Sequence, residues 1–527
     1  MQLHPTRATF QVALAGAAMV TVGVAAKVAP VVAFGGAMLL AVVLGRALAL
    51  GTVTRIRSSG FEMVWSSSRR VSRTSRDVEI ELVGELRNRG FDDARGVNLR
   101  PVASSMLDVR VVPETIDLPA ASKVRFSLFV RARRIGRWGV HGVALEVRGT
   151  PIGGDGLYEV PLMFANPHGV EVLPQSIVAL LDRPRGGRSR RAAEVGHAAP
   201  LPGEGDQLRE IREHVPGDPF KRIAWKASAR RGQLLVREME REERDVVWLF
   251  LDASVELWAG REGSAPLDVA TEELAAIASR HLARGDDVGL CVYASRIRSW
   301  IPPAAGPGHI GKICAALASA VSMVDADRSE CEEPEVAARV LEHLRPLDPR
   351  GLADVGRSDL DGLAKRADAM KSRAPFAPRL PLAPTPREQR LRHYLASFGI
   401  ELPPRIDGER DKAEATLGQI LERVVQDKKK RPSVIHVWAP APTAGPAVER
   451  SVRKLRARRI EVRWTMPSFE PGLAGGAAVS EVERVVLDAV RARVAIAQGR
   501  ARKQMRPMGV HWSRPRRAAK PRGRGAA

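Results

Sequence analysis

The sequence is poor in cysteine and aromatic residues, and it lacks the residue groupings of common hydrolases. Among 527 residues there are 3 cysteines, and aromatic residues make up 5%. Cys291, Cys314 and Cys331 form no CxxC pair and are too few for a disulfide framework, which favours a reducing compartment. No Ser/His/Asp or Cys/His assembly is evident, and Ser254 lies two residues after an aspartate rather than in a nucleophile elbow. These absences argue against an enzyme.

Acidic residues are too few to balance the basic ones. The chain has 83 Lys and Arg against 60 Asp and Glu, which gives a formal net charge of +23. Such an excess favours an anionic partner, either nucleic acid or an acidic membrane surface. The length is enough for two or three domains, each with a sizeable core.

Charged residues are also absent from two apolar stretches near the N-terminus, Phe10 to Ala26 and Val28 to Leu44. Each is about the minimum length that spans a bilayer core. Basic residues gather after the second stretch, at Arg46, Arg55, Arg57, Arg69 and Arg70. Positive charge stays on the cytoplasmic side, so residues 1–50 are predicted to form a transmembrane helical hairpin with both ends inside. A cleaved signal peptide would leave the second stretch unexplained, and a buried soluble hairpin would need polar outer faces.

The next part of the chain alternates apolar and polar residues over short segments, as in Val78 to Val83 and Val124 to Val130. Period-two alternation at this spacing predicts a β-sandwich-like domain over residues 51–175, with one face of each sheet in water. Residues 176–205 are rich in Arg, Gly, Ala and Pro without periodicity, and they are predicted to be a linker.

The pattern of apolar and polar residues changes over residues 206–498, where apolar strands are expected to alternate with amphipathic helices. The expected strands are 246–251, 288–293, 434–438 and 460–464, and the expected helices are 267–282, 310–321, 417–425, 448–455 and 480–497. This alternation predicts a Rossmann-like parallel sheet covered on both faces. An insertion is expected at about 326–412, where Pro-rich pieces flank a helix near 387–398. Residues 499–527 carry many basic residues and no acids, and they are predicted to be a disordered tail.

The most informative segment runs from Ile211 to Ser254. A turn leads into a basic and apolar stretch, an acidic run follows, and an apolar strand then ends on an aspartate. The special residues of this segment are Arg212, Glu213, Pro216, Gly217, Asp218, Arg222, Trp225, Ser228, Arg230 and Glu238. Trp225 is expected to anchor the hairpin in the core, and the arginines are expected to pair with the acidic run.

On these residues the chain resembles bacterial membrane proteins of the domain of unknown function 58 family. That family has two transmembrane helices, a β-rich domain and a von Willebrand factor A-like α/β domain, which is the order expected here. The resemblance implies a protein-protein interaction or scaffolding protein in the bacterial inner membrane, with its soluble domains in the cytoplasm. It also implies a MoxR-type AAA+ ATPase as protein partner and no enzymatic activity.

A-type domains often hold Mg²⁺ in a metal-ion-dependent adhesion site. Its pattern is Asp-x-Ser-x-Ser after the first strand, a Thr before a later helix, and an Asp after a further strand. Here Asp252 and Ser254 match the first two positions, Glu256 replaces the second Ser, and Thr416 falls at the Thr position. The strand that ends at Trp438 is followed by no carboxylate. The resemblance therefore implies a degenerate site that either binds Mg²⁺ or has lost it, with no other cofactor expected.

Other signals are weaker. The loop from Gly306 to Lys312 has phosphate-loop spacing but lacks the final hydroxyl residue, so a nucleotide-binding enzyme is an unlikely alternative. His214 and His281 have no second ligand at metal spacing, which favours structural roles. A further alternative is binding of nucleic acid or anionic phospholipid through the Arg-rich tail, where Trp512 could stack on bases. The sequence leaves the oligomeric state open.

Overall fold

A computed structural model of the whole chain describes most of its residues. The described ranges are 4–58, 61–90, 94–148, 158–174, 197–243, 245–260, 262–348, 351–352, 355, 359–406, 408, 410–427, 431–442, 446–467 and 481–513. The chain divides into two compact units. The N-terminal unit comprises Met1–Val172 and Ser322–Pro403, and the α/β unit comprises Leu173–Val321 and Pro404–Ala527.

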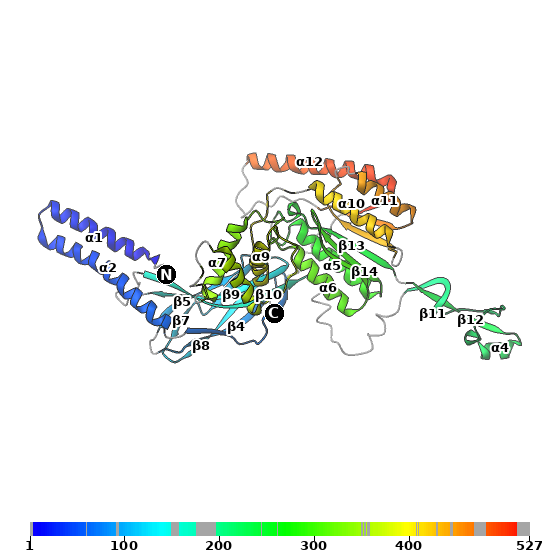
Figure 1. Cartoon of the computed structure of the whole chain (residues 1–527), viewed down its shortest axis with the longest axis horizontal. Helices are drawn as coiled ribbons and strands as arrows, with labels where there is room; N and C mark the ends of the chain where they lie inside the picture. Colours follow the sequence, from blue (N-terminus) through cyan, green and yellow to red (C-terminus); the bar gives the residue numbers. More distant parts are fainter. Residues whose placement is uncertain are drawn as a thin grey trace. The chain divides into compact units, whose positions relative to one another are not determined.

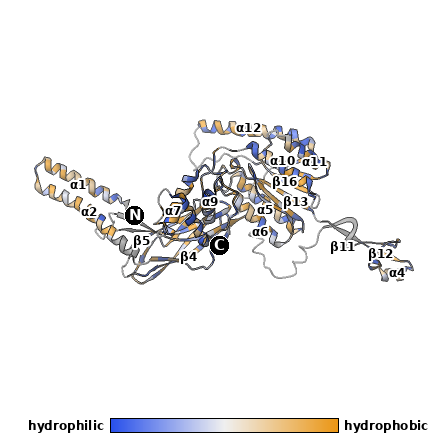
Figure 2. Cartoon of the chain, viewed as in Figure 1, coloured by the Kyte–Doolittle hydropathy of each residue, from blue (hydrophilic) through white to orange (hydrophobic). Residues whose placement is uncertain are grey.

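The two expected apolar helices are present at the start of the chain. Helix α1 spans Arg7–Ala25 and helix α2 spans Ala29–Ser58, and both are coloured as largely apolar in Figure 2. Gly16 and Gly35 let the two backbones approach closely, because a Cβ on Gly35 would lie 2.8 Å from the carbonyl oxygen of Gly16. Small residues at such a contact are typical of paired helices in membranes. Both helices are long and apolar enough to cross a membrane. Within the apolar 18-residue stretch of each helix, 17% is buried in α1 and 11% in α2.

Two antiparallel sheets follow. One has the order β1-β10-β9-β5-β7, with β3 also paired to β10, and the other has the order β2-β4-β8-β6. The strands are β1 (His4–Pro5), β2 (Phe61–Trp65), β3 (Val71–Ser75), β4 (Glu79–Asn88), β5 (Ala94–Ala103), β6 (Leu107–Val112), β7 (Thr115–Leu118), β8 (Lys123–Ala132), β9 (Gly136–Arg148) and β10 (Tyr158–Leu173). Alternate residues of β4 and β8 are buried, as the period-two pattern predicts. The indole of Trp65 in β2 donates to the carbonyl of Asn166 in β10, which ties the two sheets together.

Residues 322–403 form a helical segment that belongs to this N-terminal unit. It contains α7 (Glu333–Leu347), α8 (Leu360–Ala369) and α9 (Pro386–Phe398). The sequence predicts an insertion at about 326–412 within the α/β domain, and in the chain it does interrupt that domain. In space, however, it packs on the β-sheets. The hydroxyl of Ser104 donates to the carbonyl of Gly399 at 2.6 Å, and His343 of α7 contacts His141 of β9 at 3.0 Å.

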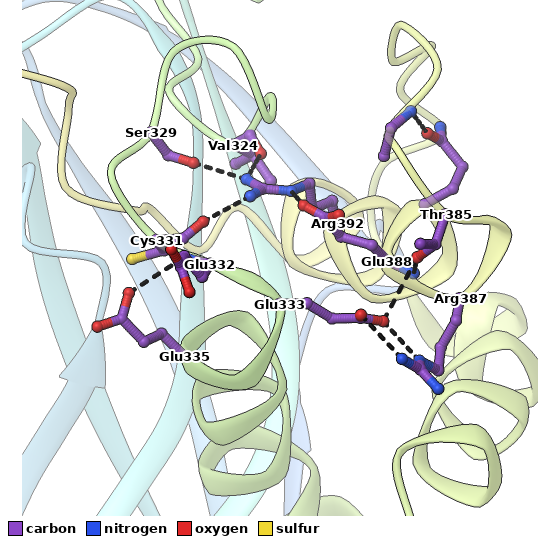
Figure 3. A network of polar contacts seen from close by, with 12 residues as sticks. Val324, Ser329, Cys331, Glu332, Glu333, Glu335, Thr385, Arg387, Glu388 and Arg392 are labelled. Atoms are coloured by element: carbon purple, nitrogen blue, oxygen red, sulfur yellow. Dashed lines mark hydrogen bonds and ion pairs between the residues drawn. The ribbon is translucent and has the colours of Figure 1, made fainter. Parts of the chain in front are cut away.

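The helical segment has its own apolar core. It also contains a network of polar contacts, which is drawn in Figure 3. The guanidinium of Arg392 in α9 is buried and donates to Glu388 at 2.7 Å and to the carbonyls of Val324 and Cys331, both at 2.7 Å. Arg387, on the same helix, forms a bidentate pair with Glu333 of α7. Because each buried charge has several partners, the network fixes α9 against α7 and the preceding loop.

The α/β unit is built on a six-stranded sheet with the order β15-β14-β13-β16-β17-β18. The strands are β13 (Val246–Asp252), β14 (Asp287–Tyr293), β15 (Ile297–Ala304), β16 (Val434–Trp438), β17 (Glu461–Thr465) and β18 (Val510–Ser513). All neighbours are parallel except β14 and β15. The first strand therefore lies in the middle of the sheet, and later strands extend it in both directions. This is the order of a doubly wound sheet.

Helices cover both faces of this sheet (Figure 1). On one face α5 (Pro266–Ala283) and α6 (Pro307–Ala320) pack against the sheet, and on the other α10 (Arg410–Gln426) and α11 (Pro446–Ala457) do so. The continuous apolar strands are buried from both sides, which explains why they show no alternation. A last long helix, α12 (Glu481–Met505), joins the core only near its C-terminal end, through Ala501 and Met505.

Two of the predicted boundaries differ from the structure. The prediction of a disordered tail over 499–527 is wrong for residues 499–513, which complete α12, form the short helix Arg506–Met508 and add the edge strand β18. Met505, Met508 and Val510 are buried in the core, and this apolar contact orders an otherwise basic segment. The indole of Trp512 packs against Trp464 rather than standing free to stack on a base. Of the predicted linker 176–205, residues 176–196 lie outside the described residues and 197–205 belong to the hairpin strand β11 (His197–Glu213).

Candidate functional site

Asp252 lies at the carboxyl end of β13, where the strand order of the sheet reverses. Ligands of doubly wound sheets bind in the crevice at this point. Asp252 is 0% exposed and stands in register with Tyr293 at the end of β14. Asp287 pairs with Val246, the first residue of β13. Asp286 and Asp287 therefore lie at the opposite edge of the sheet from Asp252.

Both carboxylate oxygens of Asp252 are already bound within the chain. Oδ1 accepts hydrogen bonds from the backbone N–H of Ser254 at 3.0 Å and from the Ser254 hydroxyl. Oδ2 accepts from the guanidinium of Arg410 at 2.5 Å. Arg410 is the first residue of α10, and it was not anticipated from the sequence because 158 residues separate it from Asp252.

The guanidinium of Arg410 is the cation of this site. Burial opposes its charge, but the carboxylate of Asp252 and the neighbouring Tyr293 and Glu256 outweigh that effect and raise the pKa of Arg410. Burial, reinforced by the negative charge of Asp252, raises the pKa of the Tyr293 hydroxyl well above its usual value, so this group stays neutral. The result is an ion pair between the buried Asp252 and the partly buried Arg410, bordered by a neutral phenol.

The remaining residues of the degenerate adhesion-site pattern are placed differently from the metal-binding arrangement. The hydroxyl of Thr416 in α10 donates to the carbonyl of Ser295 at 3.0 Å. Glu256 lies in the short helix Val255–Leu257, and its carboxylate packs against Gly408, where an added Cβ would overlap it. The residue after β16 is the buried Ala439, which offers no side-chain ligand.

This set of residues does not fit Mg²⁺. A divalent cation requires several convergent oxygens in near-octahedral geometry. Here Asp252 is paired with Arg410, and the described residues include no group of three or more His, Cys, Asp or Glu that could hold a metal ion. The arginine supplies the positive charge that a metal would otherwise bring.

The special residues between Arg212 and Glu238, which we call the signature residues, lie in a hairpin that we call the signature hairpin. It consists of β11 and β12 (Leu235–Glu243), with the short helices Phe220–Arg222 and α4 (Trp225–Arg231) between them. Arg212 forms a bidentate pair with Asp218 at 2.7 and 2.8 Å. The hydrogen bonds from Arg212, and one from the backbone of Val215, lower the pKa of Asp218 to about 2. Gly217 has φ of 110°, a conformation that a residue with a Cβ rarely adopts.

Other signature residues hold the hairpin from inside. The hydroxyl of Ser228 accepts from the backbone N–H of Leu235 at 2.9 Å and donates to the carbonyl of Ala224 at 3.1 Å. Glu238 reaches Arg212 at 3.7 Å. Pro216 and Glu213 lie in the turn and at the end of β11, and Arg222 lies in the short helix between them and α4. Most of the signature is therefore explained by the local structure of one turn.

Trp225 is not explained in this way, and the prediction that it anchors the hairpin in the core is wrong. Its side chain is 58% exposed, and that of Phe220 is 75% exposed. The two rings lie 6.2 Å apart. The interior of the hairpin is already filled by Ile223, Ala224, Leu235 and Val236. Trp225, as the first residue of a two-turn helix, is left on the outer side.

Five basic residues of the same hairpin are also exposed. Lys221, Lys226, Arg230, Arg231 and Arg237 are all exposed. Arg230, Arg231 and Arg237 have no ion-pair partner among the described residues, and the side chains of residues 239–243 lie outside the description. We call Phe220, Trp225 and these five basic residues the hairpin patch.

The loop after Gly306 is positioned poorly for a nucleotide. It follows β15, which is antiparallel to its neighbour, and leads into α6. His309, in the first turn of α6, contacts the carbonyl of Val288, near the start of β14, at 2.6 Å. The loop therefore lies at the amino edge of the parallel strands, away from the crevice. His281 is paired with Asp286 at 2.8 Å at the same edge, and His214 lies in the hairpin turn.

Residues 210–355 match the model of a family described as "Protein of unknown function DUF58". Among curated proteins, the uncharacterized protein Rv1480 of Mycobacterium tuberculosis and the uncharacterized protein Mb1516 of Mycobacterium bovis are each 28% identical over 113 residues. The alignment covers 21% of this chain and 36% of each relative, so the chain spans about a third of the length of these proteins. The family match includes the hairpin, β13 to α6, and the beginning of the helical segment.

Similarity to solved structures is slight. The PapD-like domain 7 of human CEP192 is 14% identical, covers 22% of this chain and 86% of its own, and has a TM-score of 0.16. WR4 of C. elegans, described as an MSP family member, is 7% identical, with 22% and 98% coverage and a TM-score of 0.15. Scores this low carry no conclusion about fold or function. The part of the chain that matches a family model remains the signature hairpin with the first half of the α/β unit.

Proposed function

We propose that this chain is a membrane-anchored protein-binding or scaffolding protein that binds its partner through the hairpin patch. The observation that carries the proposal is the exposure of Phe220 and Trp225, two aromatic side chains in the segment that matches the family model. Exposed aromatic residues beside arginines are the commonest centres of binding energy in protein interfaces. A hairpin that only connected two domains would gain nothing from keeping these rings in water.

The charge of the hairpin patch defines the chemistry of the partner. Five basic side chains of the hairpin are exposed, and one of its acids, Asp218, is paired with Arg212. The partner surface should therefore offer an apolar pocket bordered by carboxylates. We propose a MoxR-type AAA+ ATPase as that partner, on the resemblance to the domain of unknown function 58 family.

We further propose that the α/β unit is von Willebrand factor A-like and acts without enzymatic activity or Mg²⁺. The doubly wound order and the position of Asp252 at its switch point support the first statement. The ion pair of Asp252 with Arg410 supports the second, because it occupies the position at which such a domain would bind its ligand.

The anchor is proposed to be the α1–α2 hairpin in a bacterial inner membrane, with both soluble units in the cytoplasm. Lys27 is in the turn between the two helices and would face the opposite side. A Lys27→Cys variant should react with a membrane-impermeant maleimide on intact cells whose outer membrane is permeable to it. A Lys123→Cys variant should react only after lysis. Labelling of both variants, or of Lys123→Cys alone, would contradict this orientation.

The binding proposal is tested with the full chain in detergent and a purified MoxR-type ATPase. We expect the double variant Phe220→Ala/Trp225→Ala to reduce affinity by at least about tenfold, since each central aromatic contributes more than 1 kcal/mol in typical interfaces. The control is Leu382→Ala, because Leu382 is 81% exposed but lies in the helical segment. Equal binding by all variants would refute the hairpin patch, and absence of binding by the parent chain would refute the partner.

A further inference from the structure

Helix α12 has an apolar face that no other described part of the chain covers. Its N-terminal two-thirds contain no buried residue, and only Ala501 and Met505 near its end are buried. The exposed apolar side chains are Val482 (73%), Val485 (65%), Val486 (56%), Val490 (43%) and Ile496 (56%). A helix that merely covered a sheet would turn these residues inward.

These side chains lie on one side of the helix. Positions 482, 486, 489, 493 and 496 are three or four residues apart, so they form one stripe, and Val485 and Val490 border it. From Val482 to Ile496 the stripe is about 21 Å long at 1.5 Å per residue. Arg493 interrupts it with a charged head on an apolar stem, which can cover a neighbouring valine.

The charges of α12 are divided between its two halves. Residues 481–488 contain Glu481, Glu483 and Asp488 and a single arginine. Residues 491–503 contain Arg491, Arg493, Arg500, Arg502 and Lys503 and no acid. Acids therefore flank the valines of the first half. This arrangement is unfavourable on an anionic membrane, and the stripe contains no Trp, Phe or Leu of the kind that anchor interfacial helices.

We propose that α12 pairs with α12 of a second copy of this chain in antiparallel orientation. The two-fold axis would pass near Ala489 and Val490, so Val482 would contact Ile496 of the second copy. The acidic half of each helix would then lie along the basic half of the other. Glu483 comes within reach of Arg493 of the second copy, twice by symmetry. Parallel pairing would instead place like charges together.

The proposed contact is small, since a stable dimer in solution usually buries 1,200 Å² or more in total. The pairing is therefore reversible, and confinement of both copies to one membrane would raise their effective concentration. A two-fold axis normal to the bilayer lets both anchors enter the same membrane. This self-association uses a surface other than the hairpin patch and does not depend on the proposed partner.

The orientation is tested by cross-linking variants of the full chain that each carry one added cysteine, in membranes of expressing cells. The native Cys291, Cys314 and Cys331 are buried, and the parent chain serves as background. Ala489→Cys, near the axis, should form a covalent dimer with a short thiol cross-linker. Val482→Cys alone should not, because its two copies would be about 21 Å apart along the helices. Co-expressed and differently tagged Val482→Cys and Ile496→Cys chains should cross-link to each other.

A charge exchange tests the contact itself. Glu483→Arg and Arg493→Glu should each reduce Ala489→Cys cross-linking several-fold, and the two together should restore it. Arg484→Glu is the matched control, because Arg484 lies on the opposite side of α12 and its reversal should have no effect. Self-cross-linking of Val482→Cys would show parallel pairing and overturn the antiparallel arrangement. Parent-level dimer in every variant, or equal loss with the control, would overturn the proposed contact.

Discussion

We call the position around Asp252, at the switch point of the α/β sheet, the crevice. The crevice is expected to bind a ligand and the hairpin to be structural, but the side chains of the two regions indicate the opposite. The crevice lies at the switch point of a doubly wound sheet, yet Asp252 is buried and paired with Arg410. The hairpin is an ordinary two-stranded ribbon, yet Phe220 and Trp225 are exposed. A position at which a fold commonly binds ligands is structural once the chain pairs its own charges there, and exposed apolar side chains are then the better candidates for a binding surface.

The largest effect on stability is expected from breaking the ion pair between Asp252 and Arg410. Arg410→Ala removes one partner of a buried ion pair and leaves the Asp252 carboxylate without its cation. Breaking such a pair costs about 3–5 kcal/mol of the free energy of unfolding. Urea unfolding of the full chain in detergent, followed by the fluorescence of the buried Trp248, Trp438 and Trp464, measures it.

The double variant Asp252→Asn/Arg410→Met is the control for that measurement. It removes both charges and should recover most of the lost stability, since a buried pair replaced by neutral groups of similar size is often tolerated. An Arg410→Ala chain as stable as the parent would mean that the crevice is open to solvent, and the contrast with the hairpin patch would disappear.

The N-terminal unit contains a second polar cluster whose groups are paired within the chain. The pH dependence of its stability provides a further test of such a cluster. His141, His343 and Tyr394 form a buried hydrogen-bonded chain. Burial lowers the pKa of His141 to about 4, and burial together with His141 lowers the pKa of His343 well below its usual value. The stability that follows from keeping them neutral is present above the unfolded pKa near 6.5 and is lost as the pH falls toward the folded values.

We therefore expect the N-terminal unit to lose about 1.4 kcal/mol per pH unit for each of the two histidines below pH 6.5. Hydrogen exchange of α7 and β9 between pH 6.5 and 4.5 measures this loss. His343→Phe should flatten the profile, because one titrating group is removed while an aromatic ring is kept. A parent profile independent of pH would show that the histidines are protonated in the folded state.

The sequence predicted the repeating parts of this fold better than its long-range contacts. The strands at 246–251, 288–293 and 434–438 and the helices that follow them agree with β13, β14, β16 and their neighbours, because periodicity is a local property. The edge strand β18 was missed, since basic residues hide its few apolar contacts. The pairing of Asp252 with Arg410 and the packing of residues 322–403 on the β-sheets depend on tertiary contacts that no local pattern records.

A smaller effect is expected when the exposed rings are removed. Phe220→Ala/Trp225→Ala should change the stability of the fold by no more than about 0.5 kcal/mol, the usual range for exposed positions. Ser228→Ala, in the same helix, should cost more, because the buried N–H of Leu235 loses its acceptor. Limited proteolysis of the hairpin in the full chain separates the two variants. If the ring variant is cleaved as readily as Ser228→Ala, the rings stabilise the hairpin rather than bind a partner.

The smallest effect is expected from added Mg²⁺. A ligand that binds the folded chain raises its thermal midpoint, so a bound metal would be visible in the parent protein. Because the guanidinium of Arg410 already neutralises Asp252, we expect millimolar Mg²⁺ to leave the midpoint unchanged within the effect of the same ionic strength of NaCl. In Arg410→Ala the carboxylate of Asp252 has lost its cation, and Mg²⁺ should raise the lowered midpoint of that variant more than NaCl does. A specific rise in the thermal midpoint of the parent protein would instead show that Mg²⁺ displaces the guanidinium of Arg410 from Asp252. The crevice would then have the binding role that its position in the sheet predicts.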